Sequence, residues 1–493
     1  MAKISAPFLL SWDSIAARTD LDRFSLVRDN LPDEKIIQYL EVMRGNGRDD
    51  YPVLPMWNAL IAGIVFQHPS IEHLIRELSR NPSLLEACGF NPVPIQKKPE
   101  ATLDYNEGAQ RTKIVWLKPD DPVYKVPNSW NFSRFLENVI ELEECLGMVS
   151  NLSILLRGQL MEELPEFGLH LGYDGKAIQS NSTGHINQET QQTSDPDADW
   201  GKHETRGINS KTGKQWNKIK SWFGYNLHLI ADVKYEIPVA FEITPASHSE
   251  QTTLKKLIHA TFGQDPKLAD RCRDFVADRG LDSAGIKKTL LDGYNIRPVI
   301  DTRQLWKIER NKPDFDPSKP IIRPLFPDRN DTIFFSEKGS IHCVCPATKT
   351  LRPLLFQGFE SDRKTQKFRC PSAVNDVECP GQELCHTAGE VHPGSFGRII
   401  RVPIDKDRRI FMPTPYGTKS WEQAYNRRSA IERINNRIDN NFGFELHFIR
   451  GISKMKTRVG LALAVMMAMA LGHVREQRED QMRSLVKPIP ISA

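Results

Sequence analysis

The stretch F-G-L-H-L-G-Y-D-G, residues 167 to 175, alternates apolar and polar positions and ends on an acid, Asp174. Alternation of this kind indicates a β-strand with one face against a core. A second short run, R-D-F-V-A-D-R-G-L-D-S at 273 to 283, is apolar until it stops at Asp278. We therefore expect two strands that each deliver a carboxylate to the edge of a sheet.

The segments around these strands continue an α/β pattern. Residues 222–232 and 237–245 read as two strands joined by the short turn V-K-Y-E, which predicts a hairpin. A polar stretch, 176–215, precedes them. Residues 249–260 have helical periodicity, and 296–300 form a further short apolar run. Antiparallel strands followed by strands that alternate with helices predict a mixed α/β sheet.

Helices are expected at the N-terminal end of the chain. Residues 55–66 are apolar, and residues 70–80 open with Ser70 as a candidate N-cap. Two such helices suit either a DNA-binding module or an ordinary helical bundle, and both interpretations remain open. Residues 91–130 are rich in proline and charge and read as a linker, whereas 130–160 predicts another amphipathic helix.

Composition places the chain among ordinary soluble proteins. Its 493 residues are enough for two to four domains, with 39% hydrophobic and 26% charged residues and a net charge of +4. The start shows no secretory signal, and eight cysteines without one favour a reducing compartment. The longest apolar run, 459–472, is shorter than the roughly 20 residues that span a bilayer, so we expect a buried core helix and no membrane.

Positive charge gathers late in the chain, where residues 401–458 hold 13 Lys and Arg against 6 Asp and Glu. Within this region the stretch Y-N-R-R-S-A-I-E-R-I-N-N-R-I, 425–438, predicts a helix. At about 100° per residue, Tyr425, Arg428 and Glu432 fall within roughly 60° of one another. The apolar stripe that seats the helix consists of Ile431, Ile434 and Ile438.

Asp174, Asp278 and Glu432 are the candidate catalytic residues and metal ligands. Three neighbouring carboxylates raise one another's pKa unless a cation compensates them. Oxygen ligands favour Mg²⁺ or Mn²⁺, and two such ions about 3.5–4 Å apart stabilise both oxygens of an in-line phosphoryl transfer. The order strand, strand, helix therefore predicts a two-metal site at one sheet edge.

At this point the sequence resembles a DDE transposase of bacterial insertion sequences. The residues that carry the resemblance are Y-D-G-K at 173–176, A-D-R-G-L-D-S at 277–283, Tyr425-x2-Arg428-x3-Glu432, L-P-M-W-N-A-L-I-A-G-I-V-F at 54–66 and F-I-R-G-I-S-K at 448–454. The resemblance implies an RNase H-like core that uses two Mg²⁺ or Mn²⁺ ions to cleave transposon ends and join them to target DNA. It also implies double-stranded DNA as the partner, a homodimer in the synaptic complex, and a cytoplasmic, nucleoid-associated protein.

On this interpretation the chain divides into four parts. They are a mostly helical domain at 1–160 with a role in binding DNA ends, the first part of the RNase H-like core at 161–300, a cysteine-containing insertion at 301–415, and the C-terminal core helices at 416–493. Two further functions remain open: an inactive DNA-binding regulator derived from a transposase, and an RNase H-like nuclease without strand transfer.

One position departs from the family signature, which continues from the glutamate with six residues and then a Lys or Arg. Here that position is Asp439, on the same helix face as Glu432. We expect a cation from the following segment to replace it. The residues predicted to contact DNA are Tyr425, Arg428, Arg433, Arg437, Arg450, Lys454 and Lys456.

Five cysteines cluster in the insertion, flanked by His342 and His386. They are Cys343, Cys345, Cys370, Cys379 and Cys385. Their spacing lacks the two C-x2-C pairs of a zinc ribbon, so a structural zinc site and a set of reduced, partly buried thiols both remain open. A zinc protein that binds a protein partner would need only residues 340–386 and would leave the three acids unexplained.

Four other residues have plainer interpretations. Asp282 reads as an N-cap or as an acid that supports a metal ligand, and His228 as a packed strand histidine. Trp222 reads as a core residue. Trp306 suits either core packing or stacking on a displaced base.

Overall fold

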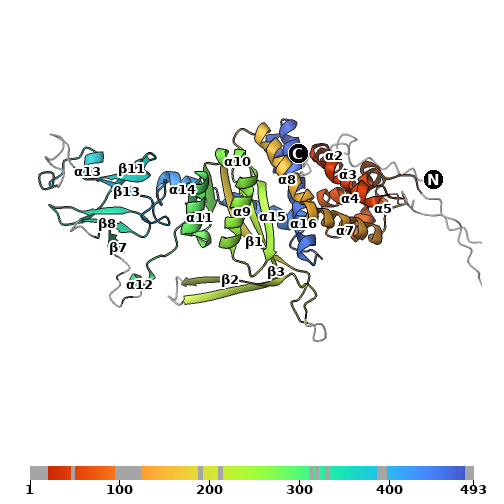
Figure 1. Ribbon diagram of the computed structural model, residues 1–493, viewed down its shortest axis with the longest axis horizontal. Helices are drawn as coiled ribbons and strands as arrows, with labels where there is room; N and C mark the ends of the chain where they lie inside the picture. Colours follow the sequence, from red (N-terminus) through yellow and green to blue (C-terminus); the bar gives the residue numbers. More distant parts are fainter. Residues whose placement is uncertain are drawn as a thin grey trace, which may run out of the picture.

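The computed structural model describes residues 20–45, 50–94, 124–186, 192–208, 215–310, 312, 316, 321–327, 332–385 and 397–483. The molecule is elongated, with the α/β part in the middle, helices of the N-terminal part at one end and a β-rich segment at the other (Figure 1). The segment read as a linker at 91–130 lies mostly outside the described residues, as does His386.

The central sheet is mixed. Its strands are β1 (His170–Gln179), β2 (Asp199–Ile208), β3 (Gln215–Asp232), β4 (Ile237–Pro245), β5 (Asp274–Ala277) and β6 (Arg297–Ile300). β3 pairs antiparallel with both β1 and β4, whereas β5 pairs parallel with β1 and β6. The order β4-β3-β1-β5-β6 confirms the predicted mixed α/β class and is compatible with an RNase H-like core.

The expected hairpin is present, but β3 begins at Gln215 and β2 falls inside the stretch that was read only as polar. β2 pairs with the first half of β3 and forms a two-stranded ribbon that projects from the sheet (Figure 1). Trp200, Trp216 and Ile219 on this ribbon are exposed. The ribbon covers no core along most of its length, so its residues lack the apolar alternation that reveals a half-buried strand.

Helices precede the sheet and cover it. Those before β1 are α2 (Asp20–Asn30), α3 (Glu34–Arg44), α4 (Val53–Val65), α5 (Ile71–Arg80), α6 (Pro82–Cys88), α7 (Ser129–Leu146) and α8 (Met148–Glu163). The single helix expected at 130–160 is two helices, because Gly147 adopts φ 60° between α7 and α8. Between the strands lie α9 (Glu250–Gln264), α10 (Pro266–Arg271) and α11 (Ala284–Lys288).

The predicted apolar core helix is α16 (Ile452–Arg475), which packs against α8, α2 and β4. Its length and composition also meet the criterion for a membrane span, but 89% of its apolar window is buried inside the protein. Burial on all sides is what an all-round apolar helix requires in a folded core. α16 thus joins the N-terminal helices to the sheet through one continuous core.

The segment 301–415 contains two small sheets with a core of their own. One sheet has β7 (Ile322–Pro324), β8 (Ile333–Ser336), β9 (Ile341–Val344) and β10 (Leu351–Pro353), and the other has β11 (Leu355–Glu360), β12 (Thr365–Arg369) and β13 (Ile399–Pro403). Short helices α12 (Lys307–Arg310) and α13 (Pro371–Val374) flank them. Trp306 is buried in this core against Phe335, so core packing is the correct interpretation for it.

The chain returns to the central sheet through α14 (Lys419–Asn426) and α15 (Ser429–Phe442). The predicted single helix at 425–438 is therefore interrupted by a turn at residues 427 and 428. Ile431, Ile434 and Ile438 are fully buried and seat α15 as predicted. Gly172 of β1 lies beneath Ile431, where an added Cβ would stand 2.5 Å from the Ile431 Cδ1 atom.

Replacing Gly172 with alanine should destabilise the protein by about 1–3 kcal/mol, because the extra methyl group overpacks buried Ile431 and Val233. Urea unfolding followed by circular dichroism measures this change. Gly158→Ala in α8 is the matched control: nothing lies near its Cβ position, and it should stabilise the helix by about 0.5–1 kcal/mol. Equal effects of the two substitutions would contradict the close approach of α15 to β1.

Candidate functional site

Asp174 and Asp278 lie at the same edge of the central sheet. β1 and β5 run parallel, and Tyr173 pairs with Ala277 in their register. Asp174 and Asp278 are the next residues of the two strands, so their backbones leave the pairing side by side. This register agrees with the prediction that the two strands bring both acids to one edge of the sheet.

One face of α15 runs along β1 beside these acids. Asn435 donates a hydrogen bond from Nδ2 to Oδ2 of Asp174 over 3.0 Å. One turn further on, Asp439 forms an ion pair with Lys176 of β1. Two consecutive turns of the helix are thus fixed to the strand that carries Asp174, and Glu432 lies one turn before Asn435 on the same face.

Glu432 is exposed and forms an ion pair with Arg428 at 2.9 Å. The same guanidinium interacts electrostatically with Asp174 and Asp278, so Arg428 is the cation that all three acids share. Within the described part of the chain, no three His, Cys, Asp or Glu side chains are close enough to hold a metal ion together. In this conformation Arg428 contacts Glu432 directly and acts on the two aspartates through its charge.

A fourth carboxylate, Glu250, belongs to this edge and was missed by the sequence analysis. It is the first residue of α9, and its Oε1 lies 2.7 Å from where a Cβ on Gly175 would stand. Burial of the carboxyl group raises the pKa of Glu250, and the negative charge of Asp278 acts in the same direction. No local pattern marks Glu250, since only the tertiary fold brings the start of α9 over β1.

The site concentrates negative charge. Burial raises the pKa of Asp174 to about 6. The charges of Glu250 and Asp278 push that pKa in the same direction, whereas the charge of Arg428 opposes them. Clustered oxygen donors that disfavour their own ionisation suit a hard divalent cation, so the donor set fits Mg²⁺ or Mn²⁺.

Comparison with known families gives one match. Residues 187–342 match the family described as the transposase DDE domain. The chain carries a DDE transposase domain. The matched residues include Asp278 and end before Glu432, and they begin after Asp174, so the roles of all three acids rest on the arrangement described above. No curated protein sequence matches the chain.

Tyr425 is near the C-terminal end of α14 and lies close to Asp278. Its ring stacks on Trp421, with centroids 4.7 Å apart and planes at 12°. Burial raises the pKa of Tyr425, and the charge of Asp278 adds to this effect. Trp421 packs in turn on Val276 and Val299 of the sheet, which holds Tyr425 at the edge where Asp278 leaves β5.

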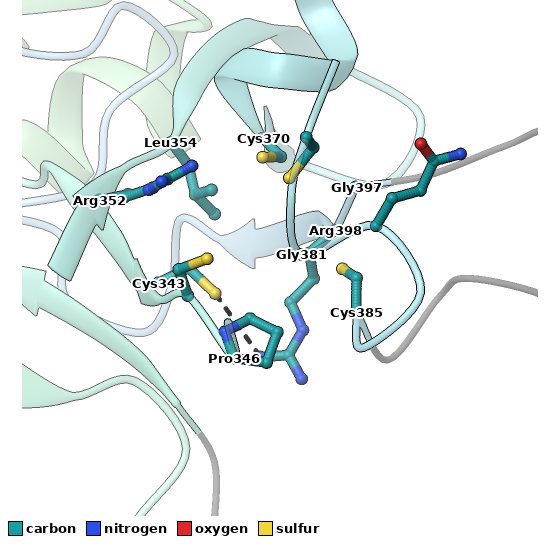
Figure 2. A pocket seen from close by; sticks show the side chains of 12 residues that line it. Cys343, Pro346, Arg352, Leu354, Cys370, Gly381, Cys385, Gly397 and Arg398 are labelled. Carbon is teal, nitrogen blue, oxygen red and sulfur yellow. Dashed lines mark hydrogen bonds between the residues drawn. The ribbon is translucent and has the colours of Figure 1, made fainter. Parts of the chain in front are cut away.

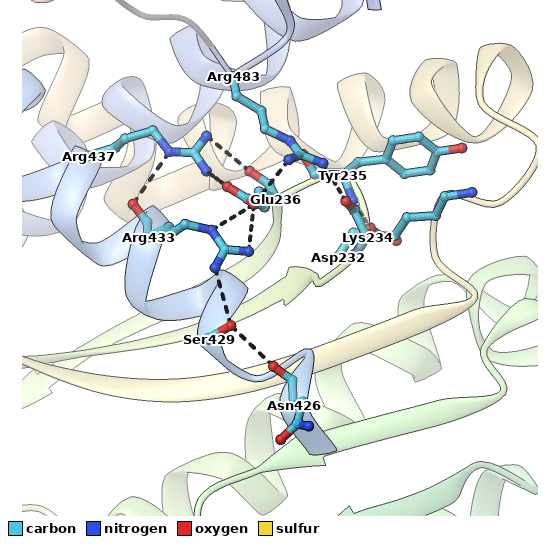
Figure 3. A network of polar contacts seen from close by, with 9 residues as sticks. All are labelled: Asp232, Lys234, Tyr235, Glu236, Asn426, Ser429, Arg433, Arg437 and Arg483. Carbon is cyan, nitrogen blue, oxygen red and sulfur yellow. Dashed lines mark hydrogen bonds and ion pairs between the residues drawn. The ribbon is translucent and has the colours of Figure 1, made fainter. Parts of the chain in front are cut away.

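Arg433 and Arg437 form ion pairs with the buried Glu236, which lies in the turn between β3 and β4 (Figure 3). Arg483 joins the same carboxylate at 3.3 Å. These contacts anchor α15 to the hairpin. DNA contact by the two helix arginines stays a prediction, and Arg433 is the better candidate because 56% of its side chain is exposed, against 12% for Arg437.

The three cations of the following segment lie apart from Asp439. Arg450 donates to the Asn181 carbonyl over 2.6 Å, and both Arg450 and Lys454 line a pocket of about 440 Å³ beside the N-terminal helices. Lys456 lies 3.8 Å from Glu242. The cation that Asp439 meets is Lys176, so in this pair the acid is on the helix and the lysine on the strand.

The structure also bears on the plainer interpretations of His228, Asp282 and Trp222. His228 is fully buried and bonded to Tyr173 and Thr244, as expected of a packed histidine. Asp282 is buried in an ion pair with Lys287 at 2.7 Å, and Ser283 takes the N-cap position of α11, so the N-cap interpretation is wrong and support of a metal ligand stays a prediction. Trp222 is only partly buried and lies across Gly201 of the projecting ribbon, so it is no residue of the main core.

Replacing Asp174 with asparagine should stabilise the metal-free protein at about pH 7. Its folded pKa of about 6 exceeds the ordinary 3.8, so ionised Asp174 opposes folding above pH 6. The gain should shrink as the pH falls from 6 towards 3.8 and vanish below. Thermal unfolding in a chelator at about pH 7 and about pH 4 measures it.

Asp362→Asn is the control, because 76% of the Asp362 side chain is exposed. It should change the melting temperature little at either pH. An Asp174→Asn variant that melts at or below the wild-type temperature at about pH 7 would contradict the described environment of Asp174.

Proposed function

We propose that this chain is an active DNA transposase that cleaves the ends of its own element and joins them to target DNA. The observation that carries the proposal is the placement of Asp174 and Asp278 at one sheet edge, opposite the helix face of Glu432, in a chain with a transposase DDE domain. Asp174, Asp278 and Glu432 are the proposed metal ligands.

Two divalent ions would activate the attacking oxygen of water or of a 3′-hydroxyl and stabilise the leaving oxygen of each phosphoryl transfer. The chain's own residues orient that chemistry. Asn435 holds the Asp174 carboxylate by one oxygen, and the Gly175 amide also donates to it. With its carboxylate fixed from the helix and from the backbone, Asp174 needs little reorganisation to present its second oxygen to a cation.

Arg428 is proposed to exchange partners during the reaction. In the present conformation its guanidinium is paired with Glu432 and offsets the charge of the two aspartates. A DNA phosphate is a competing bidentate partner for a guanidinium. Transfer of Arg428 to the phosphate would free Glu432, so DNA binding and completion of the acid site would be coupled.

The projecting ribbon supports DNA as the partner. Trp216, Lys218, Lys220 and Trp222 alternate along β3 and so share one face, which we call the ribbon face. Trp216 and both lysines are exposed. His203 pairs with Lys220 across the ribbon and acts electrostatically on Glu250, which connects this face with the acid edge.

Lysines interleaved with tryptophans suit a nucleic acid, because the lysines neutralise phosphates and the rings stack on exposed bases. Transposition also requires that two ends be cut and joined together, so we propose a homodimer as the working form. The synaptic dimer would then present two acid edges and two ribbon faces to the DNA.

Cleavage of duplex DNA that carries the ends of the encoding element tests the proposal. Wild-type protein should cut in Mg²⁺ or Mn²⁺ and stop in a chelator. Asp174→Asn and Asp278→Asn should each lower the rate at least about a hundredfold and leave DNA affinity largely unchanged. Asp362→Asn is the matched control and should cut at the wild-type rate.

Pre-cut ends separate the alternatives. A transposase should join them to a target plasmid, whereas a nuclease without strand transfer would only cleave. Specific binding with neither cleavage nor joining would overturn the proposal in favour of the DNA-binding regulator. Cutting that survives Asp278→Asn would exclude this acid site as its source.

The ribbon face has a test of its own. The double substitution Lys218→Ala with Lys220→Ala should weaken DNA binding and reduce the slope of log affinity against log salt by about 2, because each phosphate contact contributes roughly 0.9. Lys202→Ala is the control, since Lys202 lies on the opposite face of the ribbon. An unchanged slope in the double variant would contradict contact of the ribbon face with DNA.

A further inference from the structure

The five cysteines of the segment 301–415 surround one cavity. The cavity has a volume of about 40 Å³, and the cysteines that line it are Cys343, Cys345, Cys370, Cys379 and Cys385. Figure 2 shows Cys343, Cys370 and Cys385 around this space with their sulfur atoms. All eight cysteines of the chain lie in its described part, and none of them forms a disulfide there.

Three separate segments deliver these thiols. Cys343 belongs to β9, and Cys345 follows two residues later, so the C-x-C spacing places both side chains on one face of that strand. Cys370 directly follows β12 of the other small sheet. Cys379 and Cys385 flank a run of turns closed by backbone hydrogen bonds from Gln382 and Cys385.

Hydrogen-bond donors or cations face two of these sulfurs. The sulfur of Cys345 accepts hydrogen bonds from the backbone amides of Ala347 and Thr348. Arg352 and Arg398 also line the cavity, and Arg398 points a guanidinium nitrogen at the Cys343 sulfur from 4.0 Å. Four thiolates around a divalent ion carry a net charge of −2, which two nearby guanidiniums offset.

Two glycines pack closely against the cysteines of this cavity. A Cβ on Gly381 would stand 3.4 Å from the Cys345 sulfur, and a Cβ on Gly397 would stand 3.0 Å from the Cys370 Cβ. Because neither residue has a side chain, the backbone at Gly381 and Gly397 can pass close to the cysteines. The cavity exceeds the roughly 10–15 Å³ that a single water needs, so it has room for one ion.

We propose that this cavity is a structural zinc site that binds Zn²⁺ through four of the five cysteine thiolates. Thiolates are soft ligands, and four of them in tetrahedral array select zinc, at about 2.3 Å from metal to sulfur. In the described chain no three of these sulfurs converge at metal-binding distance, so closure requires rotation of the side chains about their Cα–Cβ bonds.

The site would tie the two small sheets and the 379–385 turn together. Among its described residues the segment has a core of eleven buried apolar side chains, which is small for two sheets of short strands. Metal binding that exists only in the folded state adds its free energy to folding. The zinc site therefore stabilises the segment, and it does so whether or not the chain transposes DNA.

Metal analysis of the full-length protein, expressed in ordinary medium and purified without chelator, tests the proposal. We expect about one zinc ion per chain, lost in the double variant Cys379→Ser with Cys385→Ser. Cys145→Ser is the matched control, because Cys145 is exposed on α7 outside this segment, and it should retain the zinc. Less than about 0.1 zinc per chain in folded wild-type protein, or iron in its place, would overturn the assignment.

A second measurement uses only the wild-type protein, in case the double variant fails to fold. Adding a strong chelator should raise the number of thiols that react with a disulfide reagent by about four. Hydrogen exchange should then rise in β9 and β12 and stay unchanged in α16. Thiols that react equally with and without chelator would contradict a zinc site.

Discussion

The parallel pairing of β1 with β5 is the contact on which the site depends. Its register sets Asp174 beside Asp278 at the end of the sheet, and no other feature of the fold is needed to bring these two acids together. The paired residues of both strands are buried apart from half-buried His170, so a slip of one residue would force closely packed side chains into the wrong neighbours. Gly172, under Ile431, lets α15 approach this pair closely enough for Asn435 to reach Asp174.

Negative charge at that edge is held by cations that the chain supplies itself. Arg428 forms an ion pair with Glu432 and offsets the charge of both aspartates, and Lys176 forms an ion pair with Asp439. A DNA substrate would bring phosphates and divalent ions in place of the Arg428 contact. The helix position that carries a cation in the family signature is acidic here, as Asp439. Its ion pair with Lys176 nevertheless keeps a lysine near Asp174 on β1.

Sequence patterns were sufficient where a feature is local. Strand ends, the isoleucine stripe of α15 and the α16 run all follow from the spacing of apolar residues, and each is present. The same helical count also puts Asn435 on the face of Glu432, so its contact with Asp174 was within reach of the sequence. The contacts of Glu250 and Lys176 could not be predicted from the sequence, because they arise only when elements distant along the chain pack together.

The ribbon of β2 and β3 was missed for a related reason. Its exposed residues face no core, whereas alternation of apolar and polar residues marks a strand only where one of its faces is buried. Arg433 and Arg437 show that basic residues can also stabilise the fold, while their contact with DNA stays a prediction. Their neighbours in the sequence suggest a basic DNA-binding helix, whereas both guanidiniums are paired with Glu236 from a turn about 200 residues earlier.

The most direct test of the account is the position of Mn²⁺ in a structure of the protein bound to the DNA ends of its element. Anomalous scattering locates the ion without reference to a mechanism. The account predicts manganese between Asp174 and Asp278, with Glu432 released from Arg428 and turned towards the metal. Manganese bound elsewhere, with Glu432 still paired to Arg428 in the DNA complex, would contradict it.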